Sequence, residues 1–175
     1  TLFNIEKTCY KGLENFENKL KTAIKACAVL HVDETSARVM KKNHWLHVLS
    51  TRFSSYFAIH PKRGGEAIEA IHLLPHFKGI LCHDHFKMYF HYGHDHALCN
   101  AHHLRELNYV FECTGHSWAL DMKNLLKKIK QTKDKQQLTT ATCKAFDLEY
   151  DQLIALGYKQ QTENPHPLCK APKES

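Results

Sequence analysis

The sequence predicts an α/β fold in which one mixed sheet is combined with helices. Three short segments rich in aromatic and β-branched residues follow one another early in the chain, with only a few polar residues between them, which is typical of an antiparallel meander. Two further apolar segments come later, after longer connections. Longer connections are what parallel strands require.

The chain begins with helical sequence. Apolar residues recur at helical spacing over residues 5–27 and predict one amphipathic helix. The strands of the meander are predicted over residues 29–32, 45–49 and 56–59. Arg63, Gly64 and Gly65 end the meander, and a short helix is expected over residues 67–74.

The later strands are predicted over residues 79–82 and 96–98, each preceded by a helix. Three helices are expected after them, the last one closed by Gly157. Three antiparallel strands followed by helix-linked parallel strands is a ribonuclease H-like order, here with extra C-terminal helices. The predicted parts are a leading helix (1–27), a ribonuclease H-like core (28–113), a helical extension or insertion (114–158) and a loose tail (159–175).

Composition limits the class of protein. The chain of 175 residues is long enough for one ordinary core, and its formal net charge of +6 permits a polyanionic partner without identifying one. No apolar run approaches the roughly 20 residues of a membrane span. The seven cysteines are odd in number and include no Cys-x-x-Cys, which is typical of reduced thiols and of the cytoplasm. Because the chain starts at Thr1, we expect it to be a piece of a longer protein.

Two aspartates follow predicted strands. Asp33 ends the first strand and Asp84 ends the fourth, and these strands are neighbours in a ribonuclease H-like sheet. We therefore expect the two carboxylates to meet at one sheet edge, as oxygen ligands for Mg²⁺ or Mn²⁺ in phosphoryl transfer. Asp33 and Asp84 are thus the predicted catalytic and metal-binding residues. The alternative is that each aspartate only caps the turn or helix after its strand.

Residues 79–107 contain seven histidines and two cysteines, which raises the possibility of a zinc site. Cys99 and His102 have half of a zinc-site spacing, whereas a structural site needs four ligands. Cys82 and His83 are expected on opposite faces of one strand, so they cannot both bind one ion. We expect Cys99 to pack and His102 to form hydrogen bonds near the two aspartates, and a zinc-stabilised structural domain is the alternative.

Three stretches carry a family resemblance: "VLHVDETSARV", "KRGGEAIEAIHLLPHFKGILCHDHFKMYF" and "CNAHHLREL". They resemble the transposases of the bacterial insertion sequence 66 family, over about residues 2–157. The resemblance implies a DDE transposase core, which uses three acidic residues and two divalent ions, Mg²⁺ or Mn²⁺, to cut DNA and join its 3′ end to a target. It implies Asp33 as the first acid and Asp84 as the second. It also implies that Cys99, His102 and Arg105 form the family's Cys-x-x-His-x-x-Arg motif near the site.

The third acid of that family lies in an Asn-Asn-x-x-Glu-Arg stretch, which does not occur here. We therefore expect an incomplete catalytic core, a fragment that is inactive alone. The implied partners are DNA, as element ends and target, and further copies of the transposase, with no membrane; the implied location is the bacterial cytoplasm. A catalytically inactive remnant that binds nucleic acid or protein is the alternative function.

Several charged residues have two interpretations. Arg63 and Arg105 are candidate phosphate contacts, because a guanidinium pairs bidentately with phosphate oxygens, and a surface salt bridge is the alternative for each. Glu34 is expected to point away from the face of Asp33, either behind the site or at the surface. A solvated helix face is expected for Lys127, Lys128 and Lys130, and contact with DNA is the alternative.

Overall fold

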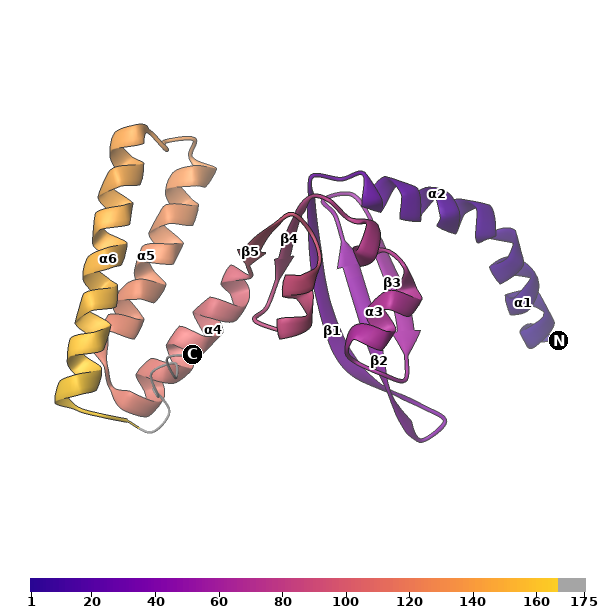
Figure 1. Ribbon diagram of the computed structural model, residues 1–175, viewed down its shortest axis with the longest axis horizontal. Helices are drawn as coiled ribbons and strands as arrows, with labels where there is room; N and C mark the ends of the chain where they lie inside the picture. Colours follow the sequence, from indigo (N-terminus) through magenta and orange to yellow (C-terminus); the bar gives the residue numbers. More distant parts are fainter. Residues whose placement is uncertain (167–175) are drawn as a thin grey trace. The chain divides into compact units, whose positions relative to one another are not determined.

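The structure is a computed structural model that describes residues 1–166. The chain divides into two compact units, Thr1–Cys99 and Asn100–Ser175. The first unit contains the sheet and the second is helical (Figure 1). Among the described residues, no helix combines the length and the apolar character that crossing a membrane requires.

The first unit begins with two helices, α1 (Leu2–Gly12) and α2 (Glu14–Lys25). The prediction of one continuous helix over residues 5–27 is wrong at this point. Gly12 ends α1, and glycine has the lowest helix propensity of any residue except proline. Only α2 contributes a buried residue, Ile24, so α2 is the helix that anchors this segment to the core.

The sheet has five strands in the order β3-β2-β1-β4-β5. The strands are β1 (Val29–Val39), β2 (Lys42–Ser50), β3 (Ser55–His60), β4 (Ile80–His83) and β5 (Asp95–Leu98). Pairing is antiparallel between β1, β2 and β3, and parallel from β1 to β4 and from β4 to β5. Three antiparallel strands extended on one side by two parallel strands form a ribonuclease H-like sheet, so the predicted fold class is confirmed.

The first strand is longer than predicted. It continues past Asp33 to Val39 because β2 pairs with it along that whole length. Its pairing with β4 ends at His31, so beyond this residue β1 has β2 as its neighbour in the ladder. Asp33 therefore lies within β1, just past the point where β4 stops pairing, and not at the end of a strand.

The connection from β4 to β5 also differs from the prediction. It contains the 3-10 segment η2 (Lys87–His91) in place of an α-helix. A residue with positive φ, Gly93, then turns the chain into β5. The stretch between the two strands is too short for a full helix and its two turns, since parallel crossovers with a helix need about a dozen residues or more.

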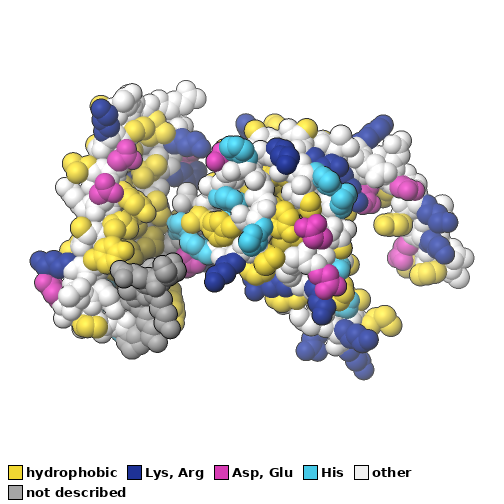
Figure 2. Space-filling view, in the orientation of Figure 1, with side chains coloured by type: hydrophobic (Ala, Val, Ile, Leu, Met, Phe, Trp, Pro, Cys, Tyr) yellow, Lys and Arg dark blue, Asp and Glu magenta, His cyan; other side chains and the backbone are white. Residues whose placement is uncertain are grey.

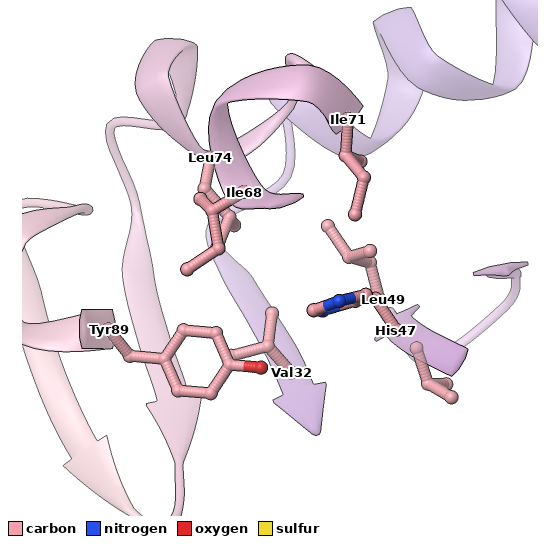
Figure 3. A pocket seen from close by; sticks show the side chains of 8 residues that line it. Val32, His47, Leu49, Ile68, Ile71, Leu74 and Tyr89 are labelled. Carbon is pink, nitrogen blue, oxygen red and sulfur yellow. The ribbon is translucent and has the colours of Figure 1, made fainter. Parts of the chain in front are cut away.

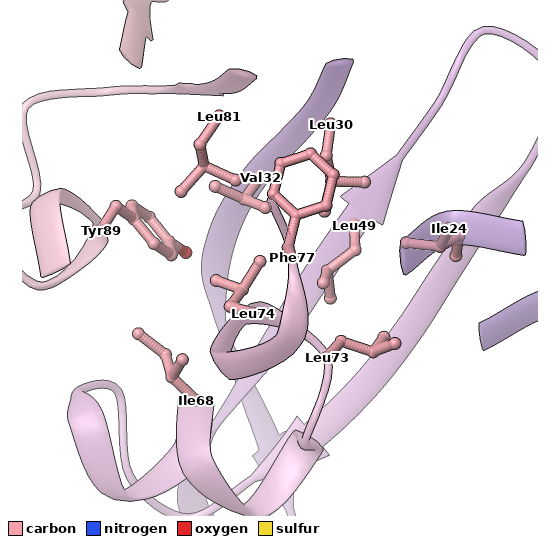
Figure 4. Packing of buried hydrophobic residues seen from close by; sticks show 10 residues of the cluster. All are labelled: Ile24, Leu30, Val32, Leu49, Ile68, Leu73, Leu74, Phe77, Leu81 and Tyr89. Carbon is pink, nitrogen blue, oxygen red and sulfur yellow. The ribbon is translucent and has the colours of Figure 1, made fainter. Parts of the chain in front are cut away.

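The core of the first unit lies between one face of the sheet and the segment that joins β3 to β4. This segment comprises α3 (Gly65–Ile71) and the 3-10 turn η1 (Leu74–His76). Figure 4 shows side chains from the strands, α2, α3 and the loops meeting there. The cluster is formed by Ile24, Leu30, Val32, Leu49, Ile68, Leu73, Leu74, Phe77, Leu81 and Tyr89. Alternation along β1 places Leu30 and Val32 on this covered face and Asp33 on the other.

The second unit consists of α4 (Asn100–Thr114), α5 (Ser117–Asp134) and α6 (Thr140–Glu163). The prediction that Gly157 closes the last helix is wrong. Gly157 lies inside α6, where a Cβ atom would come within 3.0 Å of the Trp118 ring of α5. The glycine therefore permits close packing of two helices. The predicted loose tail is helical up to Glu163, and residues 167–175, including Cys169, lie outside the described residues.

Candidate metal-binding site

Asp33 and Asp84 are aligned on neighbouring parallel strands. Asp33 belongs to β1, and Asp84 is the first residue after β4. The last pair in the β1–β4 ladder is His31 opposite Cys82, and continuing this register by two residues aligns Asp33 with Asp84. Aligned residues on neighbouring strands point to the same face, so the register brings the two carboxylates together.

The two carboxylates are close and each is oriented by the backbone. Their oxygen atoms lie within 4.8 Å of each other. The N–H of Glu34 donates to Oδ1 of Asp33 at 2.9 Å, and the N–H of Phe86 donates to Oδ1 of Asp84 at 2.8 Å. Asp33 is exposed and Asp84 is half-buried. Backbone hydrogen bonds therefore orient both carboxylates, and both are accessible to solvent.

This pair suits a hard divalent cation. Mg²⁺ binds carboxylate oxygens at about 2.0–2.1 Å, so two oxygens on one ion lie about 3–4 Å apart. Oxygens within 4.8 Å of each other reach that separation by a small side-chain rotation. Within Thr1–Cys99, no third carboxylate lies with the pair. Two carboxylates alone leave most positions around an ion to water or to other groups.

Arg63 forms an ion pair beneath the site. Its Nε donates to Oε1 of Glu34 at 2.7 Å, and the Glu34 side chain is only 1% exposed. The guanidinium also lies over the rings of Trp45 and Phe86, 4.9 and 4.4 Å from their centroids. Glu34 is thus a buried residue and not a surface one. For Arg63 the ion pair is observed, whereas a phosphate contact stays a prediction.

His83 supports the backbone of Asp84. Its side chain is buried, and its Nδ1–H donates to the Asp84 carbonyl oxygen. The other ring nitrogen, Nε2, therefore accepts from Nδ1–H of His96 at 3.1 Å. Burial is the largest influence on His83 and lowers its pKa, so the ring is neutral. His96 belongs to β5, where its side chain is exposed and forms this hydrogen bond.

The histidines and cysteines of the first unit do not form a zinc cluster. Among residues Thr1–Cys99, no three of them bring ligand atoms together. Burial, with Cys99 nearby, raises the pKa of the Cys82 thiol, so this cysteine is protonated and uncharged. The structure of this unit gives no support to the zinc-stabilised alternative.

The residues of the Cys-x-x-His-x-x-Arg motif lie around the start of α4. Cys99 directly follows β5, and its N–H donates to the His83 carbonyl oxygen at 2.8 Å. His102 and Arg105 belong to the first turns of α4 and, three residues apart, lie on one side of that helix. Both belong to the helical unit, and their placement near Asp33 and Asp84 stays a prediction.

The space between α3 and the sheet is almost completely filled by side chains. A cavity of about 10 Å³ lies between α3 and the sheet, lined mainly by apolar side chains together with His47 and Tyr89 (Figure 3). That volume holds at most about one water molecule. This cavity therefore has no room for a substrate-sized molecule.

The sequence itself places the chain in a family. It matches the family described as "Transposase IS66 family" over residues 1–173, nearly the whole chain. The chain belongs to the IS66 transposase family. This confirms the resemblance that the three stretches of sequence indicate. No curated protein matches the chain.

Two solved structures are similar to this IS66-family chain. One is the HTLV-2 integrase catalytic core domain in complex with magnesium, in a trimeric form. The match has 18% identity and a TM-score of 0.31, and it covers 71% of this chain and 80% of that chain. The other is the simian T-cell lymphotropic virus intasome in complex with the PP2A regulatory subunit B56 gamma. The match has 15% identity and a TM-score of 0.33, and it covers 84% of this chain and 58% of that chain. The chain thus spans less than two thirds of the second protein. With scores this low, the fold assignment rests on the strand order alone.

Sequence reasoning missed two residues beside the candidate site of this IS66-family chain. The Tyr89 hydroxyl donates to Oε2 of Glu34, and the Phe86 ring packs against both Arg63 and Tyr89. The aromatic content of the stretch from Phe86 to Tyr92 was the available signal. It did not identify these roles, because aromatic residues after a strand are more commonly part of a core.

Proposed function

We propose that this chain is part of the catalytic core of a DNA transposase that cuts and joins DNA strands with divalent metal ions held by Asp33 and Asp84. One observation carries the proposal: two carboxylates aligned on adjacent parallel strands, with oxygens within 4.8 Å and each fixed by a backbone N–H. Membership of the IS66 transposase family supports it. We further propose Mg²⁺ or Mn²⁺ as the ion, action in the bacterial cytoplasm, and assembly with further copies on DNA.

The chemistry follows from the ligands. In such sites, a pair of divalent ions activates the attacking oxygen and stabilises the leaving one. Asp33 and Asp84 would each bind through the carboxylate oxygen that the backbone does not already hold. We propose that a third carboxylate completes the set in the active enzyme and that Asp33 and Asp84 alone hold a metal ion weakly. His102 and Arg105 are proposed near the site because they match the family motif.

A basic surface beside the site would suit DNA. Between Thr35 and Gly65 the chain has six lysines or arginines and no acidic residue. Residues 37–44 form the end of the β1–β2 hairpin, where neither β3 nor β4 pairs with it; we call this the β1–β2 ribbon. Its exposed cations are Arg38, Lys41 and Lys42. Figure 2 shows lysine and arginine side chains, in dark blue, gathered at this end of the hairpin.

The ribbon has the dimensions that a DNA groove accepts. A two-stranded β-ribbon fits the major groove, and cations on it neutralise phosphates. The ribbon begins four residues beyond Asp33 on the same strand, which is about 14 Å at 3.4 Å per residue. DNA lying along β1 would therefore pass from the ribbon to the carboxylates.

A remnant that binds DNA without catalysis is the second candidate. The observation that favours it is the lack of a third carboxylate beside Asp33 and Asp84 within Thr1–Cys99. Such a remnant would keep the basic ribbon and its salt-sensitive DNA binding, while metal-dependent cleavage would be lost.

A strand-joining assay with Mn²⁺ and pre-cut element ends tests the proposal. We expect this chain to bind Mn²⁺ but to join strands poorly, because no third carboxylate lies with Asp33 and Asp84 within Thr1–Cys99. Robust joining that is abolished by Asp33→Ala would show that the third acid lies inside the chain, with Glu106, Glu112 and Glu149 the first candidates. Joining that survives both Asp33→Ala and Asp84→Ala would overturn the proposed site.

A further inference from the structure

Four side chains form a closed cluster directly beneath the two aspartates. Glu34 comes from β1, Arg63 from the loop before α3, and Phe86 and Tyr89 from the segment after β4. Oε1 of Glu34 accepts from Nε of Arg63, and Oε2 accepts from the Tyr89 hydroxyl. The Arg63 guanidinium lies 4.4 Å from the centre of the Phe86 ring, and that ring meets Tyr89 edge-on at 5.5 Å. Each member thus contacts at least two others.

The cluster is joined to the aspartates through the backbone. The residue whose N–H holds the Asp33 carboxylate is Glu34, and the residue whose N–H holds the Asp84 carboxylate is Phe86. The side chains of these same two residues are bridged by Arg63. A movement of either N–H group would therefore disturb the cluster. A change in the cluster would in turn move the N–H groups that orient the two carboxylates.

The burial and protonation of these residues favour a rigid cluster. The Glu34 side chain is 1% exposed and Tyr89 is 2% exposed, so water competes little for their hydrogen bonds. Burial, and next the hydrogen bond to the Glu34 carboxylate, raise the pKa of Tyr89 far above its ordinary value. The hydroxyl is therefore protonated at neutral pH and donates to Glu34. The guanidinium is planar and stacks on flat rings, which a lysine would not do.

We propose that Glu34, Arg63, Phe86 and Tyr89 are positioning residues that set the direction and spacing of the Asp33 and Asp84 carboxylates. This inference rests on the proposed function, since it assigns a role at the same metal site. None of the four is proposed as a ligand.

Mn²⁺ affinity separates positioning from simple electrostatics. Removing the positive charge of Arg63 should strengthen cation binding if only Coulomb attraction mattered. Positioning predicts the opposite: Arg63→Ala weakens Mn²⁺ binding at least tenfold, since loss of a group that orients ligands typically costs about 10–100-fold in metal affinity. The matched control is Lys62→Ala, which removes the same charge from the neighbouring exposed residue and should cause no loss of affinity.

A second variant avoids any change of charge. Tyr89→Phe removes one hydroxyl and keeps the ring, so it should fold, and we expect it to weaken Mn²⁺ binding about tenfold. Affinity is measured by calorimetry at 10 °C, with circular dichroism to establish that each variant is folded. A purely structural role would lower the thermal unfolding midpoint and leave the affinity unchanged.

The outcomes distinguish this inference from the proposed function. If Asp33→Asn abolishes Mn²⁺ binding while Tyr89→Phe and Arg63→Ala bind as tightly as the parent, the positioning role is overturned and the metal site stands. If Asp33→Asn and Asp84→Asn leave binding unchanged, the metal site itself fails and the positioning role fails with it.

Discussion

Replacing Arg63 with methionine should destabilise the first unit by an amount that the structure allows us to estimate. Breaking a buried ion pair by removing one partner costs about 3–5 kcal/mol. The Arg63 side chain is 44% exposed, so water can replace part of what Glu34 loses. We take about 2–3 kcal/mol for the pair, and about 0.5–1 kcal/mol for each of two ring contacts, part of which methionine packing restores. The expected loss in free energy of unfolding is therefore about 2–4 kcal/mol.

Urea unfolding followed by tryptophan fluorescence measures this loss. The chain has two tryptophans, Trp45 in the sheet unit and Trp118 in the helical unit, so a Trp118→Phe background reports on the sheet unit alone. Adding Glu34→Gln removes the uncompensated charge and should recover at least about 1 kcal/mol of the loss. A cost below about 0.5 kcal/mol for Arg63→Met, the range of ordinary surface substitutions, would refute the account of this ion pair.

Three further predictions concern pH, DNA and packing. Burial lowers the pKa of His47 below 6.5, so this residue takes up a proton on unfolding in acid. Its contribution to stability should be complete above pH 6.5 and fall below that pH by at most about 1.4 kcal/mol per pH unit, in addition to the contribution of His83. His47→Gln should therefore reduce the slope of stability against pH in urea titrations, and an unchanged slope would count against this assignment. Replacing the three cations of the β1–β2 ribbon with glutamine should reduce the salt slope of DNA binding by about 2.7, measured by fluorescence anisotropy, whereas no such change is expected when the same replacement is made at Lys127, Lys128 and Lys130. Gly79→Ala should destabilise the protein by about 3 kcal/mol or more in thermal unfolding, because its Cβ would lie 2.5 Å from the Ala28 carbonyl oxygen, whereas Gly12→Ala, with nothing within 4 Å, should not destabilise it.

The sheet could be predicted from the sequence because its strands carry local signals. The β-branched and aromatic runs of β1, β2 and β3, and the apolar run before Asp84, locate the strands without any long-range information. The end of β1 could not be located in this way. Residues 34–39 are largely polar and become a strand because β2 pairs with them, which no local pattern shows.

The same distinction holds at the site. Asp33 and Asp84 could be selected in advance, since each follows an apolar strand sequence and the topology makes those strands neighbours. The cluster beneath them could not, because Glu34, Arg63 and Tyr89 are brought together from three separate segments. Gly157 shows a similar limit. A glycine near a helix end is typically a stop signal, and only the position of Trp118 reveals its use in packing.

The most direct test of the central claim is a Mn²⁺ titration of this chain followed by electron paramagnetic resonance. We predict weak binding, with a Kd in about the millimolar range, because two carboxylates supply little charge and few ligands. Asp33→Asn and Asp84→Asn should each abolish it. Asp95→Asn is the control, since it removes an exposed carboxylate at the opposite end of β5 and should leave binding unchanged. Equal Mn²⁺ binding by the parent and by Asp84→Asn would contradict the account.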